Sequence, residues 1–503
     1  MNEFLKELKE VTNYTHTENG AIAHKSTLNK VYDLFAFGGA YRNRNNDDTI
    51  TLFKSAYEEN PILAKKALFY LRDIRGGQGE RRFFRVNFRW LCKNDVASAR
   101  KLLQYLPEYG RYDDLWYTTE ETELWDDMID LVKKQLELDL LSKTPSLLAK
   151  WLPSENTSSY ATRHMASQIR KSLGMSHKDY RHMLALLRER IKVVEKLMSE
   201  NRWDEIEFDK ICSRAGLIYK NAFAKRDITA KRYENFIKSK DTKVNASTLY
   251  PYQIVADALD CLDRWHDEII ADETQRQAVQ KFWDNLPNYF EGAKFKNILT
   301  MIDTSGSMTG ESKSAPINVA IGLGILAAQQ LEGPFKNHYI SFASRPQLIE
   351  IVGSDIVDQV RRIYSTNLVD NTNLIAAFDL LKRIALSSPE AAKALPDRLV
   401  VISDMEIDSA TSSWRDSMVQ WTMNSAKTEM ERLREEWARV GLTLPKLVYW
   451  NVDARNNTIL DSGDDVSFVS GMSPILFEQI CKGVTGIDLM LDKLNSDRYS
   501  VIE

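Results

Sequence analysis

Apolar residues recur at helical spacing from about residue 45 to residue 290, and Gly, Pro or Asn interrupt them at short intervals. A period of about 3.6 residues gathers apolar side chains on one face, so this pattern predicts a series of amphipathic helices. The clearest helix follows the N-cap residue Ser176 and carries Tyr180, Leu184 and Leu187 on its apolar stripe. Further helices are expected at 61–75, 80–92, 121–141, 161–173 and 273–286.

Short links between these helices favour antiparallel pairs that stack as an all-α, HEAT-like helical-repeat region. Regular helical arrays show a fixed repeat period, and none is visible in this sequence. An irregular helical domain is therefore the alternative that the pattern leaves open.

The pattern changes after about residue 296, where short apolar runs alternate with helical segments. Strands are expected at 298–302, 338–343, 399–403 and 447–451, and helices at 315–331, 373–386 and 414–440. This alternation predicts an α/β domain with a doubly wound, largely parallel sheet, in which ligands bind at the carboxyl ends of the strands. We therefore expect two domains, a helical one at 1–296 and an α/β one at 297–503.

Composition and charge fit this division of the chain. The 503 residues carry a net charge of −4, but residues 1–296 hold 48 basic and 44 acidic side chains, whereas 297–503 hold 19 and 27. Four scattered cysteines lack the spacing of a zinc site or a disulfide framework, which favours a reducing, cytoplasmic setting. The longest apolar run, 317–328, is too short to cross a bilayer, so we expect a buried helix and no membrane partner.

Oxygen-bearing side chains gather where two of the expected strands end. Asp303, Ser305 and Ser307 alternate in a turn after the first strand, Thr372 precedes a helix, and Asp404 follows a later strand. Hard oxygen ligands of this kind suit Mg²⁺ or Mn²⁺. The sequence therefore predicts a divalent-cation site at this edge of the sheet.

The motif Asp303-x-Ser305-x-Ser307, followed by Thr372 and Asp404, resembles the metal-ion-dependent adhesion site of von Willebrand factor A domains. The resemblance covers about 297–503 and implies a Rossmann-like von Willebrand A fold. It also implies that the two serines and the threonine bind Mg²⁺ or Mn²⁺ directly, with the two aspartates as ligands or water-holding partners. One coordination position would stay open for a carboxylate or another anionic ligand.

Three segments of the helical half, at 70–77, 107–115 and 247–252, resemble the domain-of-unknown-function 2828 family of bacteria and their viruses. Helical repeats followed by a von Willebrand A domain are also similar to the Ro ribonucleoprotein family, and 176–179 and 251–252 resemble parts of its TROVE module. That resemblance implies a helical ring that binds structured or misfolded RNA.

Basic side chains support this expectation independently. Between 210 and 243 the chain has ten Lys or Arg against three acidic residues, with Tyr219, Phe223, Tyr233 and Phe236 interleaved. Cations neutralise phosphates and aromatic rings can stack on unpaired bases, although a helix pair with core aromatics and a solvated lysine face would show the same pattern. The candidate RNA-binding residues are Arg75, Arg81, Arg82, Arg85, Arg170, Lys171, Lys225, Arg226, Lys231 and Arg232.

The sequence contains no recognisable catalytic arrangement. The seven histidines show no metal-ligand spacing, residues 76–79 are typical of a helix end rather than a phosphate loop, and Asp408 and Asp453 are interpreted as solvated loop carboxylates. Glu406, which alternates with Asp404, is the one carboxylate that could support a Mg²⁺ hydrolase. We therefore expect a non-enzymatic, Ro-like RNA-binding protein; the alternative is an adaptor whose metal site captures an acidic protein ligand, for example from a MoxR-type ATPase.

Overall fold

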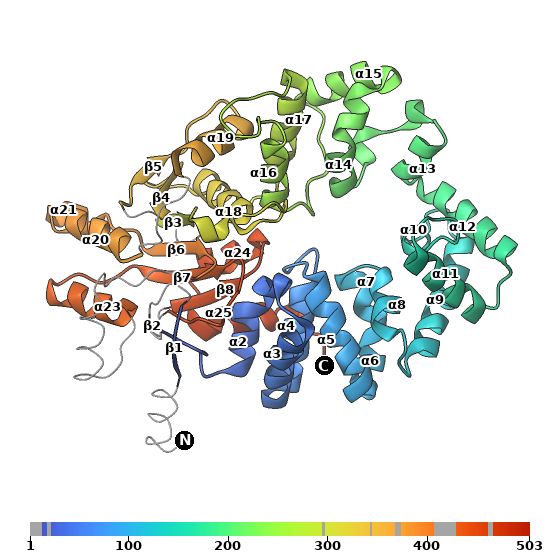
Figure 1. Ribbon diagram of the computed structural model, residues 1–503, viewed down its shortest axis with the longest axis horizontal. Helices are drawn as coiled ribbons and strands as arrows, with labels where there is room; N and C mark the ends of the chain where they lie inside the picture. Colours follow the sequence, from blue (N-terminus) through green and yellow to red (C-terminus); the bar gives the residue numbers. More distant parts are fainter. Residues whose placement is uncertain are drawn as a thin grey trace. The chain divides into compact units, whose positions relative to one another are not determined.

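The computed structural model describes residues 13–17, 22–293, 297–342, 345–367, 374–406, 429–460 and 466–503 (Figure 1). The chain divides into two compact units. The helical unit consists of Leu68–Asn245 and Ile502–Glu503, and the α/β unit consists of Met1–Ala67 and Ala246–Val501. The predicted fold class, a helical region followed by a doubly wound α/β region, is confirmed.

The helical unit is a succession of helices in which neighbours along the chain pack together: α5 contacts α6 and α8, α8 contacts α9, and α14 contacts α15. Ser176 caps α12 as expected, because its side chain accepts a hydrogen bond from the Asp179 N–H. The helices are α5 (Arg81–Asn94), α6 (Val96–Leu102), η2 (Leu103–Tyr105), α7 (Leu106–Tyr109), α8 (Asp113–Thr119), α9 (Trp125–Leu141), α10 (Leu148–Trp151), α11 (Tyr160–Ser172), α12 (His177–Ile191), α13 (Val194–Ser199), η3 (Trp203–Glu205), η4 (Phe208–Lys210), α14 (Ser213–Lys225) and α15 (Asp227–Lys238), and α4 (Pro61–Arg72) crosses the boundary between the units.

A six-stranded sheet forms the centre of the α/β unit, in the order β5-β4-β3-β6-β7-β8. All neighbouring strands are parallel except β4 and β5. The strands are β3 (Ile298–Asp303), β4 (His338–Phe342), β5 (Leu348–Glu350), β6 (Arg398–Ser403), β7 (Lys446–Asn451) and β8 (Val466–Ser470). The chain reverses its direction of winding between β3 and β6, and this switch point is where open α/β sheets bind ligands.

Helices cover the sheet from segments that lie far apart in the sequence (Figure 1). Helix α18 contacts β3, β4 and β6, whereas α2 and α25 contact β8. The helices of this unit are α2 (Lys30–Phe37), η1 (Gly38–Asn43), α3 (Asn46–Glu59), α16 (Pro251–Leu259), α17 (Glu273–Asp284), η5 (Gly306–Met308), α18 (Pro316–Gln330), α19 (Ile356–Asn367), α20 (Leu374–Ala385), α21 (Pro389–Lys393), α23 (Glu429–Arg439), η6 (Pro474–Leu476), α24 (Phe477–Lys482), α25 (Gly486–Leu494) and η7 (Asp497–Tyr499), and β1 (Tyr14–His16) pairs with β2 (Ile22–His24).

The predicted apolar segment 317–328 is a buried helix, α18, whose side chains are inaccessible throughout that range. Gly322 lets α16 pass close to it, because a Cβ atom there would lie 2.8 Å from the Tyr252 nitrogen. Residues on both sides of position 296 therefore pack into the same core. The domain boundary between residues 296 and 297 stays a prediction from the change in the hydrophobic pattern. Among the described helices, none is long and apolar enough to cross a membrane.

Candidate metal and RNA sites

The candidate metal site lies at the carboxyl ends of the neighbouring strands β3 and β6. Asp303 is the last residue of β3, and Ser305 immediately precedes the short helix η5, which contains Ser307. Ser403 ends β6, and Asp404 follows it. Because β3 and β6 pair in parallel, the two carboxylates come to the same edge of the sheet.

Asp303 holds this edge together from a fully buried position. Its Oδ1 accepts a 2.9 Å hydrogen bond from the Ser305 N–H, and its Oδ2 accepts a 2.5 Å bond from the Ser403 hydroxyl. Burial, together with the neighbouring charge of Asp404, raises the pKa of Asp303 to about 6. Two buried carboxylates side by side repel each other, and a divalent cation between them would relieve that cost.

The serine hydroxyls have the spacing that a small divalent cation requires. The Oγ atoms of Ser305 and Ser307 lie 3.1 Å apart. Adjacent oxygens around an octahedral Mg²⁺ lie about 2.9 Å apart, since each bond is about 2.0–2.1 Å long. The donor set formed by Asp303, Ser305, Ser307 and Asp404 therefore fits Mg²⁺ or Mn²⁺. The predicted fifth member, Thr372, lies outside the described residues.

Within the described ranges, no group of three or more His, Cys, Asp or Glu side chains gathers at metal-binding distance. The donor set above combines two carboxylates with two hydroxyl oxygens. The family of sites that the sequence resembles has that same property.

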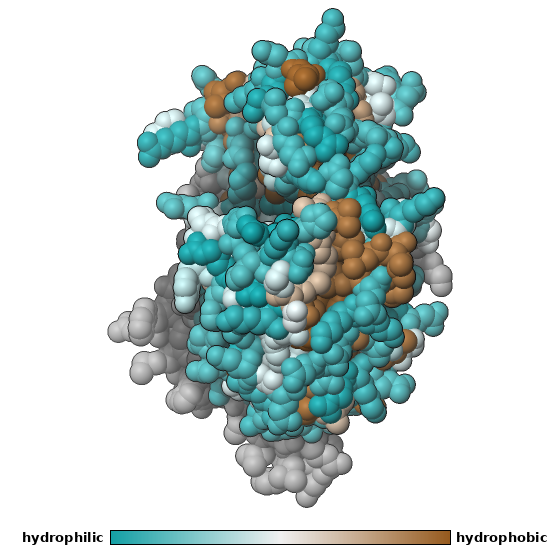
Figure 2. All heavy atoms as spheres, turned by 90° about the vertical axis from the view of Figure 1, so that its right-hand side faces the viewer, coloured by the Kyte–Doolittle hydropathy of each residue, from teal (hydrophilic) through white to brown (hydrophobic). Residues whose placement is uncertain are grey.

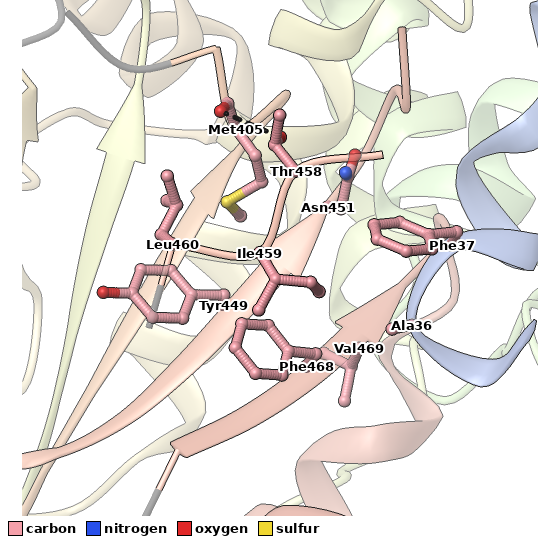
Figure 3. A pocket seen from close by; sticks show the side chains of 10 residues that line it. All are labelled: Ala36, Phe37, Met405, Tyr449, Asn451, Thr458, Ile459, Leu460, Phe468 and Val469. Carbon is pink, nitrogen blue, oxygen red and sulfur yellow. Dashed lines mark hydrogen bonds between the residues drawn. The ribbon is translucent and has the colours of Figure 1, made fainter. Parts of the chain in front are cut away.

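The loop that carries Asp404 is fixed by its own backbone and by a buried side chain. Met405 adopts a left-handed conformation with φ of 66°, and its N–H donates to the Ser403 hydroxyl at 3.0 Å. Its side chain points into a small apolar pocket between β7, β8 and the 458–460 segment (Figure 3). Such strain in a non-glycine residue is characteristic of functional sites and needs support from the surrounding fold.

Glu406, the carboxylate that could serve a hydrolase, is almost completely buried. Its Oε1 accepts a 3.3 Å hydrogen bond from the Asn456 side-chain amide, and its backbone N–H donates to Asp404 Oδ1 at 3.2 Å. A general base must reach an attacking water, and one of the two Glu406 carboxylate oxygens is already held by Asn456.

Two residues of the loop after β7 complete the edge: sequence reasoning misinterpreted Asp453 and missed Arg455. Asp453 is only 13% exposed, accepts from the Asn43 amide at 3.1 Å and has a pKa raised by burial, so its interpretation as a solvated carboxylate is wrong. Arg455 donates from Nη2 to the Ser307 carbonyl and lies 3.8 Å from Asp404 Oδ2. Their position after a strand next to β6 was the available signal. Asp408 lies outside the described residues.

Several candidate RNA-binding arginines of the helical unit are structural. Arg85 forms ion pairs with Asp113 at 2.8 Å and with Asp114 at 2.6 Å, and Arg170 is buried beside Glu155 at 2.8 Å. These guanidinium groups are occupied by buried or half-buried carboxylates, so they cannot leave them for phosphates without exposing unpaired charge. The basic residues of the sequence therefore suggest a larger cationic surface than the folded chain presents around Arg85 and Arg170.

The other candidates near these positions keep their access to solvent. Arg75, Arg81 and Lys171 are exposed, and Arg82 is half-buried. Arg75 donates to the Glu108 carbonyl at 2.5 Å, which anchors one side of its guanidinium. Partial burial and the neighbouring positive charges of Arg111 and Arg85 lower the pKa of Arg81. The turn at 76–79 follows the end of α4, as expected for a helix end.

Helices α14 and α15 carry several exposed basic side chains. Lys225 and Lys231 are exposed, whereas Arg226 stacks over the Trp203 ring at 4.6 Å. Arg232 is exposed as well, but its guanidinium donates to the backbone carbonyls of Asp204 and Ile206, each at 3.0 Å. The lysines are thus the side chains that solvent surrounds most openly, and the two arginines also hold the η3–η4 segment in place.

The interleaved aromatic residues of these helices form their core. Phe223 and Tyr233 are buried, and their rings lie 5.4 Å and 5.1 Å from the ring of Phe208. Buried rings cannot stack on bases, so the alternative interpretation of these aromatics, as core residues, is confirmed for both. Tyr219 and Phe236 are half-buried.

Models of two families of unknown function match this chain, each over a different part of it. The model of the domain-of-unknown-function family DUF2828 matches residues 17–172 and 146–291, and that of DUF7788 matches residues 297–486. A relative, the uncharacterized protein L728 of Acanthamoeba polyphaga mimivirus, is 27% identical over 513 residues, which cover 93% of this chain and 85% of that protein.

One solved structure that this chain matches is that of the Ro protein (RSR) of Deinococcus radiodurans. The match covers 91% of this chain and all of that one, with 13% sequence identity and a TM-score of 0.38. A likeness this distant assigns no function.

Proposed function

This chain belongs to the DUF2828 family, and we propose that it is a non-enzymatic RNA-binding protein with a Mg²⁺- or Mn²⁺-dependent ligand site in its α/β unit. We expect structured or misfolded RNA as the ligand of the helical unit. All four cysteines are free thiols, which accords with a reducing, cytoplasmic setting.

One observation carries the RNA proposal: the exposed lysines of α14, α15 and the segment after them. Residues 210–243 hold ten basic and three acidic side chains. Of the basic ones only Lys220 is buried. Such a surface binds phosphates by releasing condensed counterions, a mode that requires no aromatic base platform. Because Phe223 and Tyr233 are core residues, we expect mainly contacts to the RNA backbone rather than stacking between these rings and bases.

The metal site would bind an anionic group and would perform no reaction on it. Ser305 and Ser307 would supply direct ligands, and Asp303 and Asp404 would hold the ion or its waters. When bound, the cation supplies a Lewis-acidic position for an oxygen of the ligand. Hydrolysis also requires a positioned proton acceptor, and the buried, hydrogen-bonded Glu406 is poorly suited to that task.

The experiment that tests the RNA proposal uses the full-length protein purified without nuclease. We expect an absorbance ratio at 260 and 280 nm that reveals copurified nucleic acid. Filter binding of structured and single-stranded RNA should then weaken steeply as salt rises. Failure to bind either RNA at low salt would refute the proposal.

An adaptor is the second candidate function, and an apolar groove in the helical unit favours it. The groove has a volume of about 340 Å³, and half of the residues that line it are aliphatic, among them Leu147, Val193 and Ile211, while lysines and glutamates supply most of the rest. Leu141 nearby in sequence is 87% exposed, and Figure 2 shows an apolar patch on an otherwise hydrophilic face. Exposed apolar patches frequently mark protein-binding sites. A protein partner that copurifies and is lost on addition of EDTA would support this alternative.

A further inference from the structure

Arg455 forms the solvent-facing edge of the candidate metal site. Its Nη2 donates to the Ser307 carbonyl and lies 3.8 Å from Asp404 Oδ2, while its Nε lies 3.9 Å from Asp453 Oδ2. The Arg455 side chain is 35% exposed, whereas that of Asp404 is completely buried. The Arg455 guanidinium is therefore one part of the site's rim that solvent reaches.

The N-terminal segment around η1 fixes the position of the Arg455 loop. The Ala454 N–H donates to the Ala40 carbonyl at 3.1 Å, and Arg44 donates from Nη1 to the Arg455 carbonyl. Arg42, on the same segment, lies close enough to Asp453 for its charge to oppose the rise in that residue's pKa. Residues far apart in the sequence thus bring Arg42, Arg44 and Arg455 to one edge of the sheet.

We propose that Arg455 is a specificity-determining residue of the metal site and that it selects a phosphate group of RNA. This inference rests on the proposed function. A guanidinium matches the geometry of phosphate oxygens and forms strong, charge-assisted hydrogen bonds with them. Arg42 adds a second positive charge beside Asp453, which favours a strand that carries several phosphates over a single carboxylate. Arg455 thereby extends RNA binding from the helical unit to the α/β unit.

The same charge has an opposite effect on the metal. A positive group beside Asp404 repels a divalent cation, so Arg455 weakens metal binding while it strengthens binding of the anion. Removing this charge should therefore move the two affinities in opposite directions. Replacing a residue that merely supports the loop would not raise metal affinity while it lowers RNA affinity.

The test compares Arg455→Gln, Arg455→Lys and the matched control Arg439→Gln in the full-length protein. Arg439 ends α23, before β7 begins, and is therefore near the opposite edge of the sheet. Calorimetry with Mn²⁺ alone measures metal affinity. Binding of single-stranded oligouridylate, with Mg²⁺ or with EDTA, is measured in a background in which Lys225, Lys231, Lys240 and Lys243 are replaced by Glu, so that the cationic helix pair contributes little.

We expect Arg455→Gln to bind Mn²⁺ roughly fivefold more tightly and to lose roughly tenfold in Mg²⁺-dependent RNA affinity. Arg455→Lys should lie between Gln and wild type, because it keeps the charge but loses the planar fork. Arg439→Gln should match wild type in both measurements.

Three results would overturn the inference. If Arg455→Gln behaves like Arg439→Gln, the arginine only supports the loop. If oligoglutamate binds in a manner that depends on Mg²⁺ and Arg455 while oligouridylate does not, the ligand is a protein carboxylate. If wild-type protein binds RNA but Mg²⁺ adds nothing in the lysine-to-glutamate background, the inference fails while the proposed RNA function stands.

Discussion

The Ser403 hydroxyl donates a 2.5 Å hydrogen bond to Asp303 Oδ2 and so joins the ends of two parallel strands, β6 and β3. Both side chains are completely buried. The same hydroxyl oxygen accepts from the Met405 N–H, so one serine orients the Asp303 carboxylate and the turn that presents Asp404. The geometry of the candidate metal site therefore depends on a residue outside the recognisable motif.

Replacing Ser403 with Ala should lower the free energy of unfolding by about 1–3 kcal/mol, because a buried carboxylate oxygen loses its hydrogen-bond donor. It should also weaken Mn²⁺ binding. Urea denaturation and calorimetry measure the two effects. The control is Ser467→Ala, which removes a buried hydroxyl from β8 that accepts from the Gly486 N–H. That variant should lose stability and keep its Mn²⁺ affinity; equal affinity in both variants would contradict the positioning role of Ser403.

The metal assignment predicts that replacing Ser305 and Ser307 together with Ala abolishes Mn²⁺ binding. Their hydroxyls lie 3.1 Å apart and are the candidate direct ligands within the described residues. Ser312→Ala with Ser314→Ala is the matched control, because those exposed hydroxyls lie 3.0 Å apart but not beside the aspartates. Calorimetry that gives the same Mn²⁺ affinity for the Ser305/Ser307 variant and wild type would refute the assignment.

The core assignment of the helix-pair aromatics predicts a large effect on folding and a small one on RNA. Phe223→Ala should destabilise the helical unit by about 3–5 kcal/mol, as truncation of a buried phenylalanine does. Thermal unfolding followed by circular dichroism measures this loss. At a temperature where the variant stays folded, RNA affinity should remain within about twofold of wild type, because a buried ring contributes no stacking. A specific loss of RNA affinity in the folded variant would show that the ring meets bases after all.

The non-enzymatic assignment predicts that purified protein leaves end-labelled RNA intact over hours in the presence of Mg²⁺ or Mn²⁺. Glu406→Gln should change nothing in this assay, because that carboxylate is buried and accepts from Asn456. Cleavage that depends on metal and disappears in both Glu406→Gln and Asp303→Ala would make this protein a hydrolase.

Sequence patterns correctly predicted the elements that are determined by residues adjacent in the chain. Ser176 caps α12 through its own side chain, and the Asp303-x-Ser305-x-Ser307 spacing places a hydrogen-bonded turn at the end of an entirely buried apolar strand. Both features depend on residues close together in the chain. The edge strand β5 escaped prediction because it is three residues long and mostly exposed, and therefore lacks an apolar signal.

Partners that lie far apart in the sequence escaped prediction. Arg85 looks like a surface cation until Asp114, 29 residues later, pairs with it, and Arg170 likewise meets Glu155. Arg455 reaches the metal site only because β6 and β7 pair in parallel, which puts the loops that follow them side by side. Charge in a sequence gives no information about such partners, so the basic candidates divide into structural and exposed groups only in the folded chain.

The most direct test of the RNA-binding account is filter binding after charge reversal on the helix pair and the segment that follows it. Lys225, Lys231, Lys240 and Lys243 are replaced by Glu, which spares Arg226 and Arg232 because these also hold Trp203 and the Asp204 carbonyl. Lys93, Lys101, Lys133 and Lys134, exposed on other helices of the same unit, receive the same change as the control.

The account predicts that reversal on the helix pair lowers RNA affinity at least tenfold and reduces the slope of log affinity against log salt by about 3, because four phosphate contacts are lost. In the control variant the RNA affinity should stay within about twofold of wild type, and the slope should stay within about 0.5 of the wild-type slope. Equal affinity and slope in the helix-pair variant, the control and wild type would contradict the account, because the lysine surface would then be solvated without binding RNA.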